Sequence, residues 1–290
     1  MAAHLGAARP LVDDATLAEV ARRAADEAAR SGAFDEAAAH LSFALDLTAH
    51  AGDTAQRGEL LLARGRILWA AERAEESSAV LGEAADLARR TGHVELLARI
   101  ALSWRGGELR TIFRRADHKF LALLGEALTA CPTDDSRLRC LLLARLALCG
   151  YSDIGDAEGI ATCDVAVAMA RRLGDPEALA TALGTRFYYR WRPELARERL
   201  AIADEILAVA ATADDPGLIA QARYFRILAL LDLGWLRDAW RELEQFEHAV
   251  AAGGPPMLNL RALWLRSTRH LAQGQLSTDP RHRRTSARSA

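Results

Sequence analysis

The side chains in this sequence best suited to binding are four neighbouring aromatic residues: Phe187, Tyr188, Tyr189 and Trp191. Such rings offer large apolar contact areas, and they carry much of the binding energy at protein interfaces. Two interpretations are open. Either the rings line a surface that recognises a partner or a small ligand, or they pack between neighbouring helices around Pro193. Because adjacent residues on a helix point in different directions, we expect at least one ring to lie outside the core.

A second candidate site is a group of basic residues in an irregular stretch: Arg105, Arg110, Arg114, Arg115 and His118. The guanidinium groups of Arg114 and Arg115 can bind an acidic partner or a nucleotide. The alternative is a solvated surface, because Glu108 and Asp117 lie among the basic residues and can pair with them.

No pattern in the sequence indicates catalysis. The pairs Asp13-Asp14, Asp134-Asp135 and Asp214-Asp215 recur at one place in a repeat, which favours helix capping over acid–base chemistry. The histidines form no metal-ligand motif, and neither a nucleophile-elbow nor a phosphate-loop pattern occurs. We therefore expect no enzymatic activity, no metal and no cofactor.

The compartment is inferred from cysteines and apolar runs. Four cysteines lack C-x-x-C spacing, and most fall on or beside apolar helix faces, which predicts buried thiols: Cys131, Cys140, Cys149 and Cys163. Residues 1–9 lack the apolar segment of a signal peptide, and no uncharged apolar run reaches about 18 residues. These features predict a cytoplasmic protein without membrane contact.

The elements that position these residues are set by a periodic pattern. Turn signals recur about every forty residues, in register at residues 13, 53, 93, 134, 175, 215 and 254. This period is typical of helical repeat arrays, in which each unit buries its apolar face against its neighbours. The composition agrees, because the chain is 51% hydrophobic but only 6% aromatic and is rich in the helix formers Ala and Leu.

Each unit is predicted to hold two antiparallel helices. In the first unit, helices span residues 15–30 and 34–49, and Asp13 caps the first of them. We expect Asp53, Asp134, Asp175 and Asp215 to act as caps at the equivalent positions. The sixth unit repeats the pattern with a helix over 218–233, a turn at Gly234 and a second helix from Trp235.

The seventh unit is incomplete, with one predicted helix over residues 258–272. That helix would expose apolar side chains on a face without a partner helix, drawn from Leu260, Leu263, Trp264 and Leu271. We therefore expect self-association through this end. In total, the sequence predicts an all-α fold: a right-handed superhelix of antiparallel helix pairs over residues 1–274, followed by a disordered basic tail over 275–290.

Helix pairs with a small-residue turn, a following apolar residue and an alanine resemble tetratricopeptide repeats in a longer, MalT-like form. Residues 21–29 with 34–38, and 168–176 with 192–193, 199–200 and 204–205, are similar to the repeat region of large LuxR-type ATPase regulators. The resemblance implies a scaffold that binds a protein, a peptide or a small-molecule inducer on its concave face. It transfers no ATP-binding or DNA-contact residue.

The predicted function is therefore a protein-interaction or signal-sensing scaffold. The alternative is a DNA-associated transcriptional regulator, truncated or part of a complex. It would touch DNA through the assembled complex or through the tail arginines Arg281, Arg283, Arg284 and Arg288. The formal net charge of −2 does not favour direct nucleic-acid binding.

Overall fold

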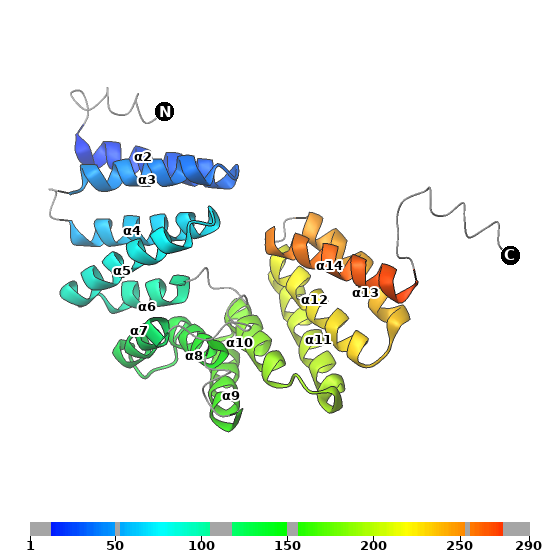
Figure 1. The fold of residues 1–290 in the computed structure, drawn as a ribbon. Coiled ribbons are helices and arrows are strands. Elements are labelled where there is room, and N and C mark those ends of the chain that lie inside the picture. Colours follow the sequence, from blue (N-terminus) through cyan, green and yellow to red (C-terminus); the bar gives the residue numbers. More distant parts are fainter. Residues whose placement is uncertain (1–12, 50–52, 105–117, 150–155, 253–255, 275–290) are drawn as a thin grey trace, which may run out of the picture. The chain divides into compact units, whose positions relative to one another are not determined.

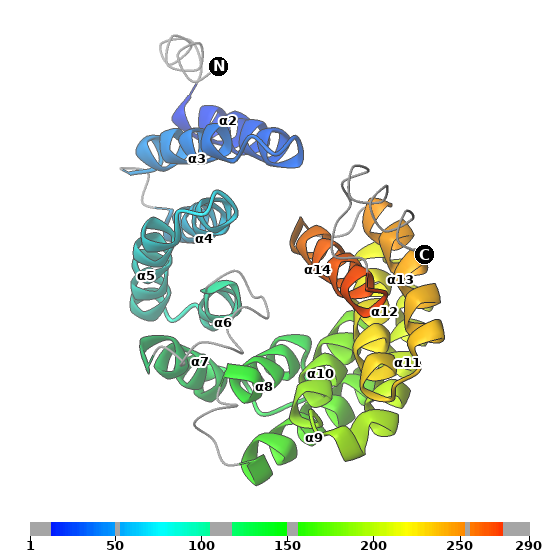
Figure 2. The same ribbon diagram turned by 45° about the vertical axis from the view of Figure 1, so that its right-hand side comes forward.

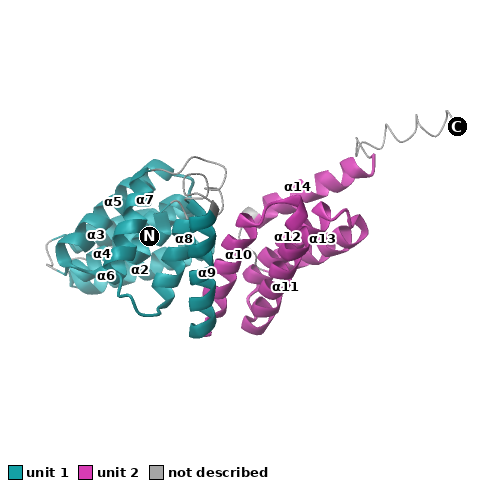
Figure 3. Cartoon of the chain, turned by 90° about the horizontal axis from the view of Figure 1, so that it is seen from below, with its two compact units in different colours: residues 1–173 teal, residues 174–290 magenta. Residues whose placement is uncertain are grey.

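A computed structural model describes residues 13–49, 53–104, 118–149, 156–252 and 256–274 (Figure 1). Over these ranges the chain folds into helices and contains no β-strand, so the predicted all-α class is confirmed. The chain divides into two compact units, each larger than one predicted repeat. The first unit comprises residues 1–173, and the second unit comprises residues 174–290 (Figure 3).

The first unit is a succession of helices joined mostly by short turns. These are α2 (Asp14–Arg30), α3 (Phe34–Leu47), α4 (Thr54–Ala70), α5 (Ala74–Thr91), α6 (Val94–Ser103), α7 (His118–Ala130), α8 (Arg137–Cys149) and α9 (Asp156–Leu173). Each helix packs against the next, and α6 also packs against both α4 and α8. Helices α4, α6 and α8 thus form a row of their own, and α5 and α7 both lie on one side of this row (Figure 2).

The second unit has the same alternation. It contains α10 (Pro176–Tyr189), a short 3₁₀ helix η3 (Pro193–Leu195), α11 (Ala196–Ala213), α12 (Pro216–Asp232), α13 (Leu236–Ala251) and α14 (Pro256–Ala272). Helix α12 packs against both α10 and α14, while α11 and α13 lie on the other side of this row (Figure 2). The helix boundaries predicted for 15–30, 218–233 and 258–272 are confirmed to within about two residues.

Aspartates begin the helices at four of the five predicted positions. Asp13, Asp53, Asp175 and Asp215 each accept hydrogen bonds from backbone N–H groups in the first turn of α2, α4, α10 and α12. The prediction for Asp134 is wrong. At the start of α8, Ser136 Oγ accepts the N–H of Arg139 at 3.2 Å, while the neighbouring carboxylate of Asp135 binds Arg172.

The turn between paired helices has a recurring steric pattern. Gly32 and Gly234 have positive φ, and the alanine five residues later, Ala37 or Ala239, is fully buried where two helices meet. In the α4–α5 turn, Glu72 holds the equivalent positive φ of 63°. Ser77, five residues after it, is buried and donates its hydroxyl to Gly65 O at 2.7 Å.

Each unit has an apolar core. Alanine and leucine dominate the core of residues 17–149, whereas Trp240 and Phe246 enlarge the core of residues 220–265. All four cysteines are buried, as the sequence predicts. Among the described helices, none combines the length and the apolar character that crossing a membrane requires.

Candidate functional site

The structure describes only some of the site residues that the sequence predicts. Tyr188 and Tyr189 lie at the C-terminal end of α10 and are buried, whereas Trp191, just beyond the helix, is 41% exposed. Arg114 and Arg115 lie outside the described residues, as do the tail arginines at 281–288. One ring of the aromatic group thus lies outside the core, as expected.

The aromatic residues form a packed cluster in the second unit. Phe187 stacks on Phe225 of α12, with ring centroids 4.5 Å apart and planes inclined by 23°. Tyr188 stacks on Trp191 at 5.7 Å and meets Phe225 edge-on. Gly184 makes the close approach of α10 and α12 feasible, because a Cβ there would lie 3.3 Å from Phe225. Packing therefore accounts for Phe187 and Tyr188, whereas Trp191 stays partly exposed to solvent.

A buried arginine lies under this aromatic cluster. The Arg199 side chain is fully buried, and its guanidinium carbon lies 5.3 Å from the Phe187 ring and 5.2 Å from the Trp191 ring. Nη2 forms an ion pair with Asp232, whereas Nε and Nη1 have no hydrogen-bond partner in the described part of the chain. The electron-rich ring faces take the place of a second acceptor and compensate part of the cost of burying this charge.

A second group of polar residues lies along the row of even-numbered helices: Tyr188 on α10, Gln221 and Tyr224 on α12, and Arg261 on α14. We call these four residues the donor cluster. Arg261 stacks over the Tyr224 ring at 4.4 Å and donates from Nη1 to Gln221 Oε1 at 3.2 Å. This bond fixes the orientation of the Gln221 carboxamide, whose Nε2 is buried without a hydrogen-bond partner.

The electrostatics link the four residues. Burial raises the pKa of both Tyr188 and Tyr224, because the phenolate form would lose its hydration, and the positive charge of Arg261 opposes this rise in each case. Within the described residues, Arg261 forms no ion pair, so its charge is balanced only by the faces and dipoles of neutral groups.

The first unit contains an arginine equivalent to Arg261, but its partner is a carboxylate. Arg99 on α6 binds Glu59 on α4, forty residues earlier, as Arg261 binds Gln221 forty residues earlier. The carboxylate of Glu59 neutralises Arg99, while the carboxamide of Gln221 leaves Arg261 charged. The forty-residue register would have revealed this contrast in the sequence, but the sequence reasoning missed Gln221, Tyr224 and Arg261.

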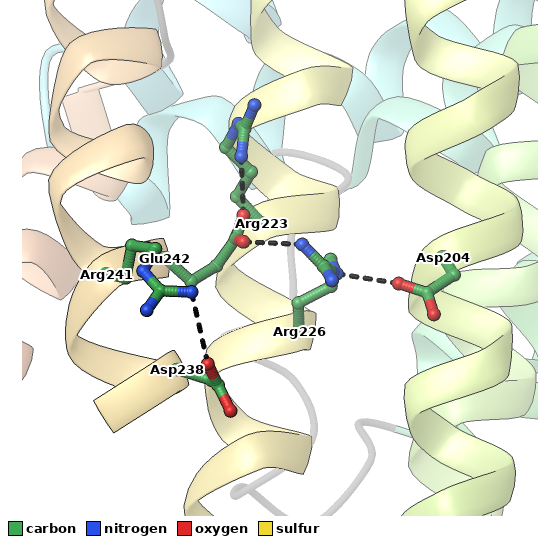
Figure 4. Close-up of polar contacts among 6 residues, drawn as sticks. All are labelled: Asp204, Arg223, Arg226, Asp238, Arg241 and Glu242. Atoms are coloured by element: carbon green, nitrogen blue, oxygen red, sulfur yellow. Dashed lines mark hydrogen bonds and ion pairs between the residues drawn. The ribbon is translucent and has the colours of Figure 1, made fainter. Parts of the chain in front are cut away.

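A network of ion pairs joins α11, α12 and α13. Glu242 on α13 accepts from Arg223 at 2.6 Å and also from Arg226, both on α12 (Figure 4). Arg226 in turn donates to Asp204 on α11 at 2.6 Å, so three consecutive helices are connected (Figure 4). Because Arg223 and Arg226 have carboxylate partners, we assign this network to structure and not to ligand binding.

The outer face of α14 carries large exposed apolar side chains. Leu260, Leu263, Trp264 and Leu271 are between 54% and 63% exposed, whereas Leu258, Ala262 and Leu265 on the opposite face are buried. The sequence prediction named these four exposed residues, and all four are exposed. No described element packs against this face, which we call the α14 apolar face.

Among the described residues, no group of three or more metal-ligating side chains could hold a metal ion. No protein-family model matches the sequence, and a search of curated proteins finds no match. The resemblance to the repeat region of LuxR-type regulators therefore stays a prediction.

Proposed function

We propose that this chain is a protein-interaction scaffold of tetratricopeptide-like helix pairs, and that its α14 apolar face binds a second copy of the chain. The observation that carries the proposal is the exposure of Leu260, Leu263, Trp264 and Leu271 on one face of one helix. Single exposed apolar residues are ordinary, but a contiguous group of this kind typically marks an interaction surface.

We propose in addition that the helix pairs form a right-handed superhelix, as the sequence predicts, and the spacing of the contacts between helices favours a repeat architecture. Contacts recur at a nearly constant sequence separation. Arg99–Glu59 and Arg261–Gln221 are forty residues apart, and Arg89–Glu126 and Arg172–Asp135 are thirty-seven apart. In such arrays each helix buries its apolar stripe against its neighbours, so an uncovered stripe favours the addition of another helix.

The surface of the second copy that binds this face can be inferred from the apolar side chains that the chain exposes. Elsewhere in the described residues, large exposed apolar side chains occur singly or in pairs: Val20, Val165, Leu173, Trp191, Trp235 and Leu236. The matching surface on a second copy is therefore its own α14 apolar face. A twofold axis brings two identical faces together, which is the commonest symmetry of protein dimers. The sequence of residues 275–290 holds one large apolar residue, Leu276, and so offers little apolar surface of its own.

Analytical ultracentrifugation of the wild type over a range of concentrations tests the proposal. We expect a monomer–dimer equilibrium that Leu263→Glu and Trp264→Glu abolish, because each places a charge in the apolar contact. Both positions are exposed, so the substitutions leave the packing within the monomer intact. Val165→Glu, at a similarly exposed residue of α9, is the matched control and should dimerise like the wild type.

Two results would overturn the proposal. One is a wild-type monomer at concentrations of about 100 µM, well above the dissociation constants of functional homodimers. The other is a dimer that persists unchanged in Leu263→Glu and Trp264→Glu, because the contact would then lie on a different surface.

A further inference from the structure

We infer that the donor cluster of Tyr188, Gln221, Tyr224 and Arg261 binds a small oxyanion, of the carboxylate or phosphate class. The inference concerns a different surface from the α14 apolar face and does not depend on dimerisation. It begins from the uncompensated charge of Arg261.

The first step is the contrast between two equivalent pairs. In the first unit, Glu59 binds Arg99 through two parallel hydrogen bonds, at 2.6 and 2.9 Å, so the guanidinium is fully neutralised. In the second unit, Gln221 provides one acceptor oxygen to one nitrogen of Arg261. The remaining N–H groups of Arg261 have no protein acceptor among the described residues.

The second step concerns the groups around Arg261, which are also hydrogen-bond donors. The Gln221 carboxamide turns its oxygen to Arg261 and leaves Nε2 buried without an acceptor. Burial raises the pKa of Tyr188 and of Tyr224, so both phenols stay protonated and can donate a hydrogen bond. A buried donor without a partner, such as Gln221 Nε2, is unfavourable, so an added acceptor would stabilise it.

The third step is the chemistry that fits these donors. One positive charge with several N–H and O–H donors favours an anion with at least two oxygens. A planar carboxylate can bind the guanidinium through two bonds, and a phosphate can do the same with further oxygens left for the phenols. The half-buried positions of Gln221, Tyr224 and Arg261 leave them accessible from solvent while strengthening the charge interaction.

Gln221→Glu is the decisive variant. It supplies the carboxylate that Glu59 supplies in the first unit, so Arg261 becomes neutralised within the protein and the anion loses its partner. Because the variant gains an ion pair in a contact that already exists, it should fold, and thermal unfolding followed by circular dichroism checks this. Arg261→Gln removes the charge itself. Arg241→Gln, at an exposed arginine of α13, matches its change in net charge and serves as the control.

The experiment is a calorimetric titration of the full chain with inorganic phosphate and, separately, with succinate, at constant ionic strength maintained by sodium chloride. We expect saturable binding of at least one anion to the wild type and to Arg241→Gln, weakened tenfold or more in Gln221→Glu and Arg261→Gln. Binding of phosphate alone assigns the site to phosphate compounds, and binding of succinate alone to carboxylates. Leu263→Glu should bind as the wild type does, because one chain forms the whole cluster.

Two outcomes would overturn the inference. Absence of saturable binding of both anions to the wild type is one. Equal affinity of the wild type, Gln221→Glu and Arg261→Gln is the other, since the anion would then bind elsewhere.

Discussion

Arg99 and Glu59 are forty residues apart in the sequence, yet their side chains form two parallel hydrogen bonds between α6 and α4. The pair joins two helices that are not consecutive, so it holds one helix pair against the next. Arg73–Asp35, Arg89–Glu126 and Arg172–Asp135 join residues thirty-seven or thirty-eight apart in the same unit. These four ion pairs therefore follow the repeat period.

The start of α8 offers a direct comparison of two capping candidates. Ser136→Ala removes the oxygen that accepts the N–H of Arg139 and should lower the free energy of unfolding by about 1 kcal/mol. Asp134→Ala should change it by less than about 0.5 kcal/mol, because the Ser136 hydroxyl already caps the helix. Urea unfolding of both variants measures the difference. The reverse order, with Asp134→Ala more damaging, would show that Asp134 is the cap after all.

Two glycines within helices should respond to alanine with opposite signs. At Gly65 a Cβ would lie 2.5 Å from a methyl group of Leu81, which is fully buried and has little room to move. Gly65→Ala should therefore destabilise the protein by about 1–3 kcal/mol. At Gly125 in α7 a Cβ meets nothing within 4 Å, so Gly125→Ala should stabilise by up to about 1 kcal/mol through helix propensity. Thermal unfolding of the two variants tests the signs, and a shift in the same direction would contradict the steric argument.

The turns between paired helices allow a reciprocal test of backbone strain. Glu72 adopts a φ of 63°, which costs a residue with a side chain about 1–2 kcal/mol, whereas Gly32 adopts the equivalent conformation without this cost. Glu72→Gly should stabilise the protein by up to about 1 kcal/mol, after the greater freedom of glycine in the unfolded chain is subtracted. Gly32→Ala should destabilise it by about 1 kcal/mol, although a Cβ there meets nothing within 4 Å. Urea midpoints of the two variants should move in opposite directions, and a destabilised Glu72→Gly would be incompatible with strain at this turn.

These positions also show how far the sequence determines the fold. The helices, the aspartate caps and the exposed residues of α14 follow from local patterns, because spacing along one helix decides which side chains share a face. Asp134 was wrongly assigned because a neighbouring serine competes for the same N–H groups. The donor cluster could not be found from local spacing, because it joins side chains of α10, α12 and α14. Their convergence depends on how successive helices pack, and only the forty-residue register hints at it.

The last prediction concerns stability at alkaline pH. Burial raises the pKa of Tyr188 above its ordinary value of 10.0, so the phenol stays neutral in the folded protein at pH values where it ionises in the unfolded chain. Between these two pKa values the folded state binds more protons, and the free energy of unfolding therefore falls as the pH rises above 10. The full contribution of Tyr188 is present below pH 10.

Tyr188→Phe keeps the ring that stacks on Trp191 but cannot ionise, so it should lose less stability between pH 9 and pH 11 than the wild type does. Urea unfolding of both proteins at the two pH values measures the effect. An equal loss in both would mean that other groups, such as Tyr224 or the buried thiols, control the alkaline transition.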